Sequence, residues 1–169
     1  MTKKYFFENV EDLIAYLYTK VDTIPPLKLQ KALYFLYAYY SAMFTAHEEN
    51  KDISEVTYNL PAELFPAKFQ AWYYGPVINS VYLLRKYNED HFKQLADKFS
   101  VYKHFSSPDQ KQVRGFIDKL FNTVLKSSDF GLVDRSHEDK AWKNAFAKGR
   151  AREMDSQEII KEYAVKFAK

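Results

Sequence analysis

Histidines and carboxylates are the first side chains to consider for chemistry, because imidazole and carboxylate groups bind metal ions and transfer protons. The chain has four histidines, which are far apart along the sequence: His47, His91, His104 and His137. None of them begins a His-Glu-x-x-His zinc motif. His137, Glu138 and Asp139 are consecutive, but consecutive side chains on a helix diverge by roughly 100°. We therefore interpret this trio as a helix start with a locally hydrogen-bonded histidine, and we predict no catalytic residue and no metal site.

Many enzymes depend on a nucleophilic side chain or on a loop that binds phosphate groups. The sequence has no cysteine, which excludes disulfides, thiol nucleophiles and Cys-ligated metals. It has no Gly-x-Ser-x-Gly elbow, and its four glycines are too scattered to build a phosphate loop. We therefore predict that the chain is not an enzyme and uses no cofactor.

Aromatic side chains are the most distinctive part of the composition, with 14 Tyr, 14 Phe and 2 Trp. Most rings in a small domain fill the core, which is the competing interpretation for any single residue. A domain of this size cannot bury all of them, and tyrosine and tryptophan are common anchors between proteins. The candidate residues for contact with a protein partner are Tyr34, Tyr37, Trp72, Tyr73 and Tyr74.

Length and charge limit which other classes of protein the chain can belong to. A chain of 169 residues has room for one domain, and we predict a single unit with its core within about residues 10–167. The start of the chain lacks the apolar stretch of a signal peptide, and the most apolar run, residues 32–46, is shorter than a membrane span. We expect a cytoplasmic protein that does not enter a membrane. The net charge is only +3, and the basic cluster in residues 140–152 is interpreted as a solvated helix face.

The spacing of apolar residues predicts a mainly α fold of about six helices. Asn9 can cap the first helix, Pro25 and Pro26 can begin the second, and Ser107 with Gln110 forms a capping box. Because the second helix is apolar on all sides, we expect it at the centre of the fold. The apolar positions of the six helices fall within residues 10–17, 29–43, 77–84, 113–124, 141–146 and 159–167.

One small antiparallel hairpin is expected between the second and third helices. Residues 56–60 and 68–74 alternate in character, as strands do, and Pro61 and Pro66 lie between them. Gly75 and Pro76 would close the second strand before the next helix.

Three segments together resemble the Panacea domain, a family often labelled phage-associated protein. Residues 27–35, Leu-Lys-Leu-Gln-Lys-Ala-Leu-Tyr-Phe, resemble the Leu-Lys-Leu-Gln-Lys helix of that family. Residues 69–77, Phe-Gln-Ala-Trp-Tyr-Tyr-Gly-Pro-Val, are similar to its Ala-Trp-x-Tyr-Gly-Pro-Val segment, and residues 136–142 resemble its Ser/Thr-His pair followed closely by Trp. The resemblance spans nearly the whole chain. The positions that match the family motifs are Leu29, Gln30, Lys31, Trp72, Gly75, Pro76, Tyr82, His137 and Trp142.

The resemblance implies an antitoxin that neutralises a cognate toxin by direct binding and covers its active or target-binding surface. Toxins that accompany the family include alarmone-synthetase-like enzymes that modify tRNA, membrane-depolarising peptides and other translation inhibitors. A related branch acts as a proteolytic adaptor, so delivery of a toxin to a protease is an alternative. An enzyme that reverses the modification made by the toxin is another. No appended DNA-binding domain is visible, and direct DNA binding is not expected.

Overall fold

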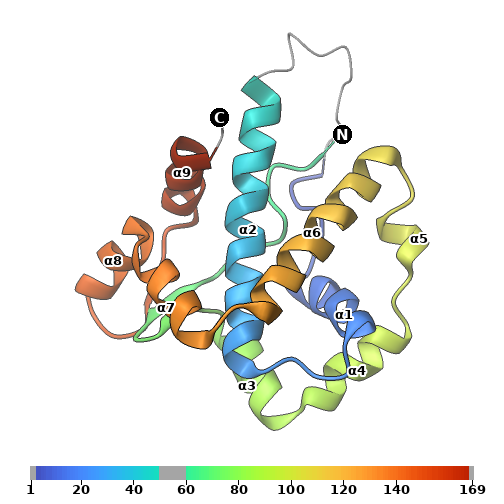
Figure 1. Cartoon of the computed structure of the whole chain (residues 1–169), viewed down its shortest axis with the longest axis horizontal. Helices are drawn as coiled ribbons and strands as arrows, with labels where there is room; N and C mark the ends of the chain where they lie inside the picture. The colour runs from blue at the N-terminus through green and yellow to red at the C-terminus, as the bar shows by residue number, and fades with distance from the viewer. Residues whose placement is uncertain (1–2, 50–59, 168–169) are drawn as a thin grey trace.

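The computed structural model describes residues 3–49 and 60–167, shown in Figure 1. Within these ranges the chain is mainly helical, with nine helices and one three-stranded sheet, which confirms the predicted fold class. The helices are α1 (Val10–Lys20), α2 (Pro26–Glu49), α3 (Asn79–Tyr87), α4 (Glu89–Asp97), α5 (Val101–His104), α6 (Pro108–Lys126), α7 (Asp129–His137), α8 (Lys140–Ala147) and α9 (Ser156–Phe167). The strands are β1 (Gln70–Trp72), β2 (Gly75–Val77) and β3 (Arg152–Glu153).

Helix α2 is the centre of the fold, as its sequence predicts. It packs against α3, α6, α7, α9 and β2, and Figure 1 shows it between the C-terminal helices on one side and α1 and α6 on the other. Leu33 and Leu36 are buried on one stripe of the helix, and Phe35 is buried on another. A helix that is apolar on all sides is stable in water only when other elements surround it, and here they do.

Side-chain caps set where several helices begin. The Asn9 side chain accepts from the Glu11 amide at 3.0 Å before α1. At the start of α6, the Ser107 hydroxyl accepts from the Gln110 amide at 3.2 Å, and the Gln110 side chain accepts from the Ser107 amide at 3.0 Å. The predicted capping box is therefore confirmed, and it satisfies two backbone donors that have no partner within the helix.

The sheet differs from the predicted hairpin. β1 pairs antiparallel with β2, so that Trp72 lies opposite Gly75, and β3 adds to the other edge of β1 in the order β2-β1-β3. Gly75 and Pro76 therefore belong to a strand and do not end one. The expected partner strand at residues 56–60 lies, apart from its last residue, outside the described residues.

The described helices outnumber the six of the sequence prediction because the polar stretches between them are also helical. Helices α4 and α5 fill the segment before the capping box. Ser128 caps α7 by accepting from the Gly131 amide at 3.0 Å, so this glycine lies inside a helix. Within the described ranges, no helix combines the length and the apolar character that a membrane crossing needs.

Candidate binding site

A two-residue turn at the tip of the sheet presents two tyrosines to solvent. Tyr73 and Tyr74 connect β1 to β2 and are 69% and 60% exposed. Their rings meet edge to face with centroids 5.0 Å apart. Exposed rings of this size form an apolar surface that a partner protein can cover.

Side chains from outside the sheet bind the backbone of this turn. The carbonyl oxygens of residues 72, 73 and 74 lie, in chain order, 2.9 Å from Trp142 Nε1, 2.8 Å from His137 Nε2 and 2.5 Å from Lys31 Nζ. Trp142 and Lys31 are donors, and the imidazole must also donate because a carbonyl oxygen only accepts. The turn is therefore attached to α2, α7 and α8 at once.

A stack of aromatic rings continues from the turn along α8. The His137 ring lies on Trp142 with centroids 4.0 Å apart and an interplanar angle of 17°, and Trp142 lies on Phe146 at 4.7 Å and 17°. Phe146 is exposed, and its ring centroid is 6.5 Å from that of Tyr73. The exposed rings of Tyr73, Tyr74 and Phe146 thus form one surface, which we call the aromatic surface.

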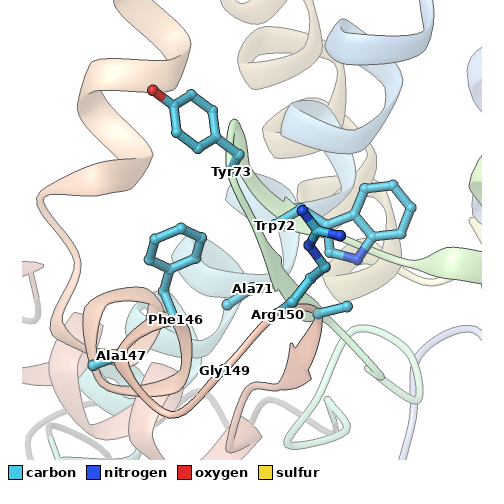
Figure 2. Close-up of a pocket in the computed structure, with 8 residues that line it drawn as sticks. Ala71, Trp72, Tyr73, Phe146, Ala147, Gly149 and Arg150 are labelled. Carbon is cyan, nitrogen blue, oxygen red and sulfur yellow. The ribbon is translucent and has the colours of Figure 1, made fainter.

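A cleft of about 550 Å³ adjoins the aromatic surface. Figure 2 shows Tyr73 and Phe146 on one side of the β1 ribbon and the Trp72 indole on the other. Arg150 is the charged residue of the lining, and Lys148 and Arg152 are exposed close to it in sequence. The lining consists of Ala71, Trp72, Tyr73, Phe146, Ala147, Gly149, Arg150 and Ala151.

Comparison with known proteins gives one match. The family model described as "Antitoxin SocA-like, Panacea domain" matches residues 29–143, which is more than half of the chain. The chain belongs to this Panacea antitoxin family. No curated protein and no solved structure matches it.

The Panacea motif residues gather around the turn and the side of α2 that faces it. Gln30 holds the end of β2, because its side chain accepts from the Ile78 amide at 2.8 Å and donates to the Ile78 carbonyl at 3.2 Å. Tyr82 packs edge to face on the half-buried Trp72 ring, with centroids 5.0 Å apart. The remaining apolar motif residues, Leu29 and Pro76, are buried. Motif segments that are far apart in the Panacea sequence therefore meet at one place.

Two of the candidate contact residues lie in the core. Tyr34 and Tyr37 are completely buried on α2, because neighbouring elements cover this part of the helix. The Tyr37 hydroxyl donates to Glu63 Oε1 at 2.6 Å, and burial raises its pKa well above the usual value. The spacing of aromatic residues on one helix does not tell which rings other elements cover. A partner cannot reach these two rings without opening the core, so only Trp72, Tyr73 and Tyr74 remain candidates.

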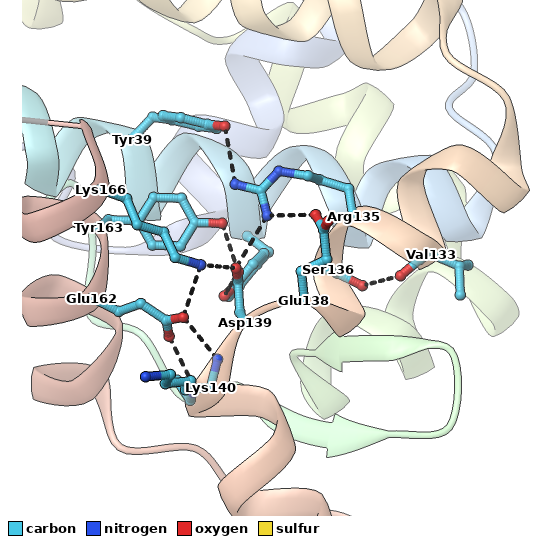
Figure 3. Close-up of polar contacts among 12 residues, drawn as sticks. Tyr39, Val133, Arg135, Ser136, Glu138, Asp139, Lys140, Glu162, Tyr163 and Lys166 are labelled. Carbon is cyan, nitrogen blue, oxygen red and sulfur yellow. Dashed lines mark hydrogen bonds and ion pairs between the residues drawn. The ribbon is translucent and has the colours of Figure 1, made fainter.

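The sequence prediction missed a buried polar cluster around Asp139, drawn in Figure 3. Asp139 is 0% exposed, and its Oδ2 accepts from the hydroxyls of Tyr34 at 2.5 Å and Tyr163 at 2.6 Å. Its Oδ1 lies 3.1 Å from Arg135 Nη1 and 3.4 Å from Lys166 Nζ. Burial is the largest cause that raises the pKa of both tyrosines, and the negative charge of Asp139 raises it further. These hydroxyls therefore act as donors at neutral pH, and the cluster joins α2, α7 and α9.

Asp139 precedes α8 but does not cap it. Glu162 from α9 does so, because its carboxylate accepts from the Lys140 amide at 2.8 Å and the Ala141 amide at 3.0 Å. Partial burial opposes ionisation of Glu162, but these amides and Lys166 lower its pKa overall. From the sequence alone, an aspartate at the start of a helix is expected to cap that helix. No local signal shows that a distant glutamate caps it instead.

The described residues show no arrangement for metal chemistry. Among the residues whose side chains the structure describes, no group of three His, Asp or Glu side chains could hold a metal ion. His91 Nε2 lies 2.5 Å from Glu11 Oε1. His137 ends α7 and binds the distant Tyr73 carbonyl, so its interpretation as a helix start with a local hydrogen bond is wrong. The site presents the apolar area of its exposed rings, the hydrogen-bonded backbone of the turn and the positive charge of Arg150.

Proposed function

We propose that this Panacea protein is a cytoplasmic antitoxin that binds its cognate toxin directly and covers the active or target-binding surface of that toxin. The observation that carries the proposal is the aromatic surface of Tyr73, Tyr74 and Phe146 beside a cleft. Exposed tyrosines on a fixed turn are suited to be anchors, because they bury large areas and lose little conformational entropy on binding. The family supports a toxin as the partner.

The first experiment is co-purification with the product of the neighbouring gene, together with rescue of growth when that gene is expressed. We expect a stable complex and restored growth. The binding surface is then tested with Tyr73→Ala, Tyr74→Ala and Phe146→Ala. Each should weaken toxin binding by about 30-fold or more, the effect typical of an anchor residue, while the melting temperature changes little.

Tyr102→Ala is the matched control. Tyr102 is 83% exposed on α5, and Figure 1 shows α5 on the opposite side of the molecule from α8. This variant should bind the toxin like the wild type. Equal binding by all four variants would contradict the proposed surface, and absence of any complex would contradict direct neutralisation.

The amount of toxin in the cell separates occlusion from delivery to a protease. Under our proposal the toxin stays abundant and inactive when the antitoxin is present. Rapid loss of toxin that depends on a protease would instead identify a proteolytic adaptor. Reversal of a toxin-made modification by the purified chain, without the toxin, would identify an enzyme.

A further inference from the structure

Three consecutive carbonyl groups, that of the last β1 residue and those of the two turn residues, each accept from a side chain outside the sheet. Residues 72, 73 and 74 are bound by Trp142, His137 and Lys31 at 2.9, 2.8 and 2.5 Å. A surface turn can satisfy its carbonyl groups with water and needs no protein donors. Three side-chain donors therefore fix the backbone conformation of this short turn.

Lys31 is the most unusual of the three donors. It is only 1% exposed, and burial lowers its pKa to about 8, with Asp129 acting in the opposite direction. Burying an ammonium group destabilises a fold unless its hydrogen bonds compensate. Its described hydrogen bond goes to the turn, at the carbonyl oxygen of Tyr74.

Gly75 makes room for this contact. A Cβ atom at Gly75 would lie 2.5 Å from Lys31 Nζ and 2.6 Å from Ser136 Oγ. Its φ of +120° is also a conformation that other residues rarely adopt. The backbone of β2 and the ammonium group can therefore approach each other only because this position has no side chain.

The other two donors are held by packing. The His137 ring donates from its edge to the turn carbonyl and stacks its face on the Trp142 ring, and Trp142 itself stacks on Phe146. Stacking fixes the orientation of both rings, and thus the direction in which each N–H points.

We propose that Lys31, His137 and Trp142 are positioning residues that lock the Tyr73–Tyr74 turn in the conformation that the toxin binds. This inference rests on the proposed function for the use of the turn, but not for the lock itself. A turn that is already ordered loses less entropy on binding, so the complex gains affinity without a direct contact from any of the three donors.

The test uses variants that remove each donor and keep most of its packing: Lys31→Met, His137→Phe and Trp142→Phe. The control is Lys28→Met. Lys28 is on the same helix and also donates to a backbone carbonyl, but to that of Leu125 at 2.9 Å and not to the turn. Two quantities are measured on the full chain: hydrogen exchange of the amides of residues 73–75, and the dissociation constant for the purified toxin.

We expect amide exchange in the turn to rise about 10-fold in each of the three variants and to stay unchanged in Lys28→Met. Toxin binding should weaken by about 10-fold in the same three variants, the effect of about 1.4 kcal/mol. Melting curves identify any variant that fails to fold. Trp142→Phe keeps an aromatic ring in the stack, and we therefore expect this variant to remain folded.

The two measurements separate the lock from the proposed function. Unchanged exchange in the turn of all folded variants would overturn the proposal. Faster exchange with unchanged toxin affinity would overturn the role of the lock in binding, whereas the proposed surface is decided separately by Tyr73→Ala, Tyr74→Ala and Phe146→Ala. If the wild type binds no toxin, the exchange measurement still decides whether these residues lock the turn.

Discussion

Of the four glycines, Gly75 is the one at which an added methyl group meets the closest contacts. Gly75→Ala places a Cβ within 2.5 Å of Lys31 Nζ at a φ of +120°, so both contact and backbone strain oppose it. We expect it to reduce the free energy of unfolding by about 3 kcal/mol, measured by urea denaturation. Gly115→Ala is the control, because nothing lies within 4 Å of a Cβ there and the position is exposed on α6. Gly115→Ala should raise the free energy of unfolding by about 0.5–1 kcal/mol. Equal effects of the two substitutions would contradict this explanation.

Lys31 makes the stability of the protein depend on pH. Because burial lowers its pKa from 10.5 to about 8, the unfolded chain binds more protons at this residue than the folded chain between these two values. The contribution of Lys31 to the free energy of unfolding therefore rises with pH through this window. We expect the wild type to gain about 2 kcal/mol relative to Lys31→Met between pH 7 and pH 10.

Paired urea titrations at these two pH values measure this gain. Tyr16 has a pKa raised to about 12, with burial as the largest cause, so it and similar tyrosines oppose the trend above about pH 10. Both proteins carry the same tyrosines, and their contributions cancel in the difference. A difference that does not change with pH would show that Lys31 titrates normally in the folded chain.

At the scale of elements, Asp139 links α9 to α2 and α7 through buried hydrogen bonds and ion pairs. The carboxylate accepts from Tyr34 on α2 and Tyr163 on α9, and it is completely buried. Asp139→Asn keeps the shape but removes the charge and directs an amide donor toward groups that are themselves donors. We expect a loss of about 3–5 kcal/mol in thermal or urea unfolding. Asp134→Asn, exposed on α7, should change stability by less than about 0.5 kcal/mol.

Local signals explain which elements could be predicted. The capping box at Ser107 and the apolar pattern of α2 involve residues within a few turns of each other, so the sequence alone reveals them. The sheet could not be predicted, because β3 is two residues long and pairs with a strand about 80 residues earlier. The Asp139 cluster was missed for the same reason, since its partners come from helices that only tertiary packing brings together.

The same limit applies to the candidate site. Tyr34 and Tyr73 are both tyrosines in motif segments, and nothing local distinguishes a covered ring from an exposed one. The structure separates them, because neighbouring elements cover α2 around Tyr34 and the hairpin turn projects from the sheet. The motif at residues 69–77 contains the turn, although residues 73 and 74 were expected in a strand. The attachment of the turn to Lys31, His137 and Trp142 depends on the packing of α2, α7 and α8.

At the scale of the whole molecule, the net charge of +3 is small, but the chain near the cleft is locally basic. Arg150 lines the cleft, and Lys143, Lys148 and Arg152 are exposed near it in sequence. We expect the toxin surface that docks here to carry carboxylates, because opposite charges speed association and fix orientation. Association with the toxin should then slow about 10-fold between 50 and 500 mM salt, while dissociation changes less, as stopped-flow kinetics would show.

A pair of charge reversals distinguishes this local effect from the total charge. Arg150→Glu and Lys111→Glu each lower the net charge by two, but Lys111 is exposed at the start of α6, away from the cleft. If the cleft faces an acidic surface, Arg150→Glu slows association strongly and flattens its salt dependence, whereas Lys111→Glu has a small effect. Equal effects would mean that only the overall charge steers the toxin. Faster association of Arg150→Glu would mean that the docking surface of the toxin is basic.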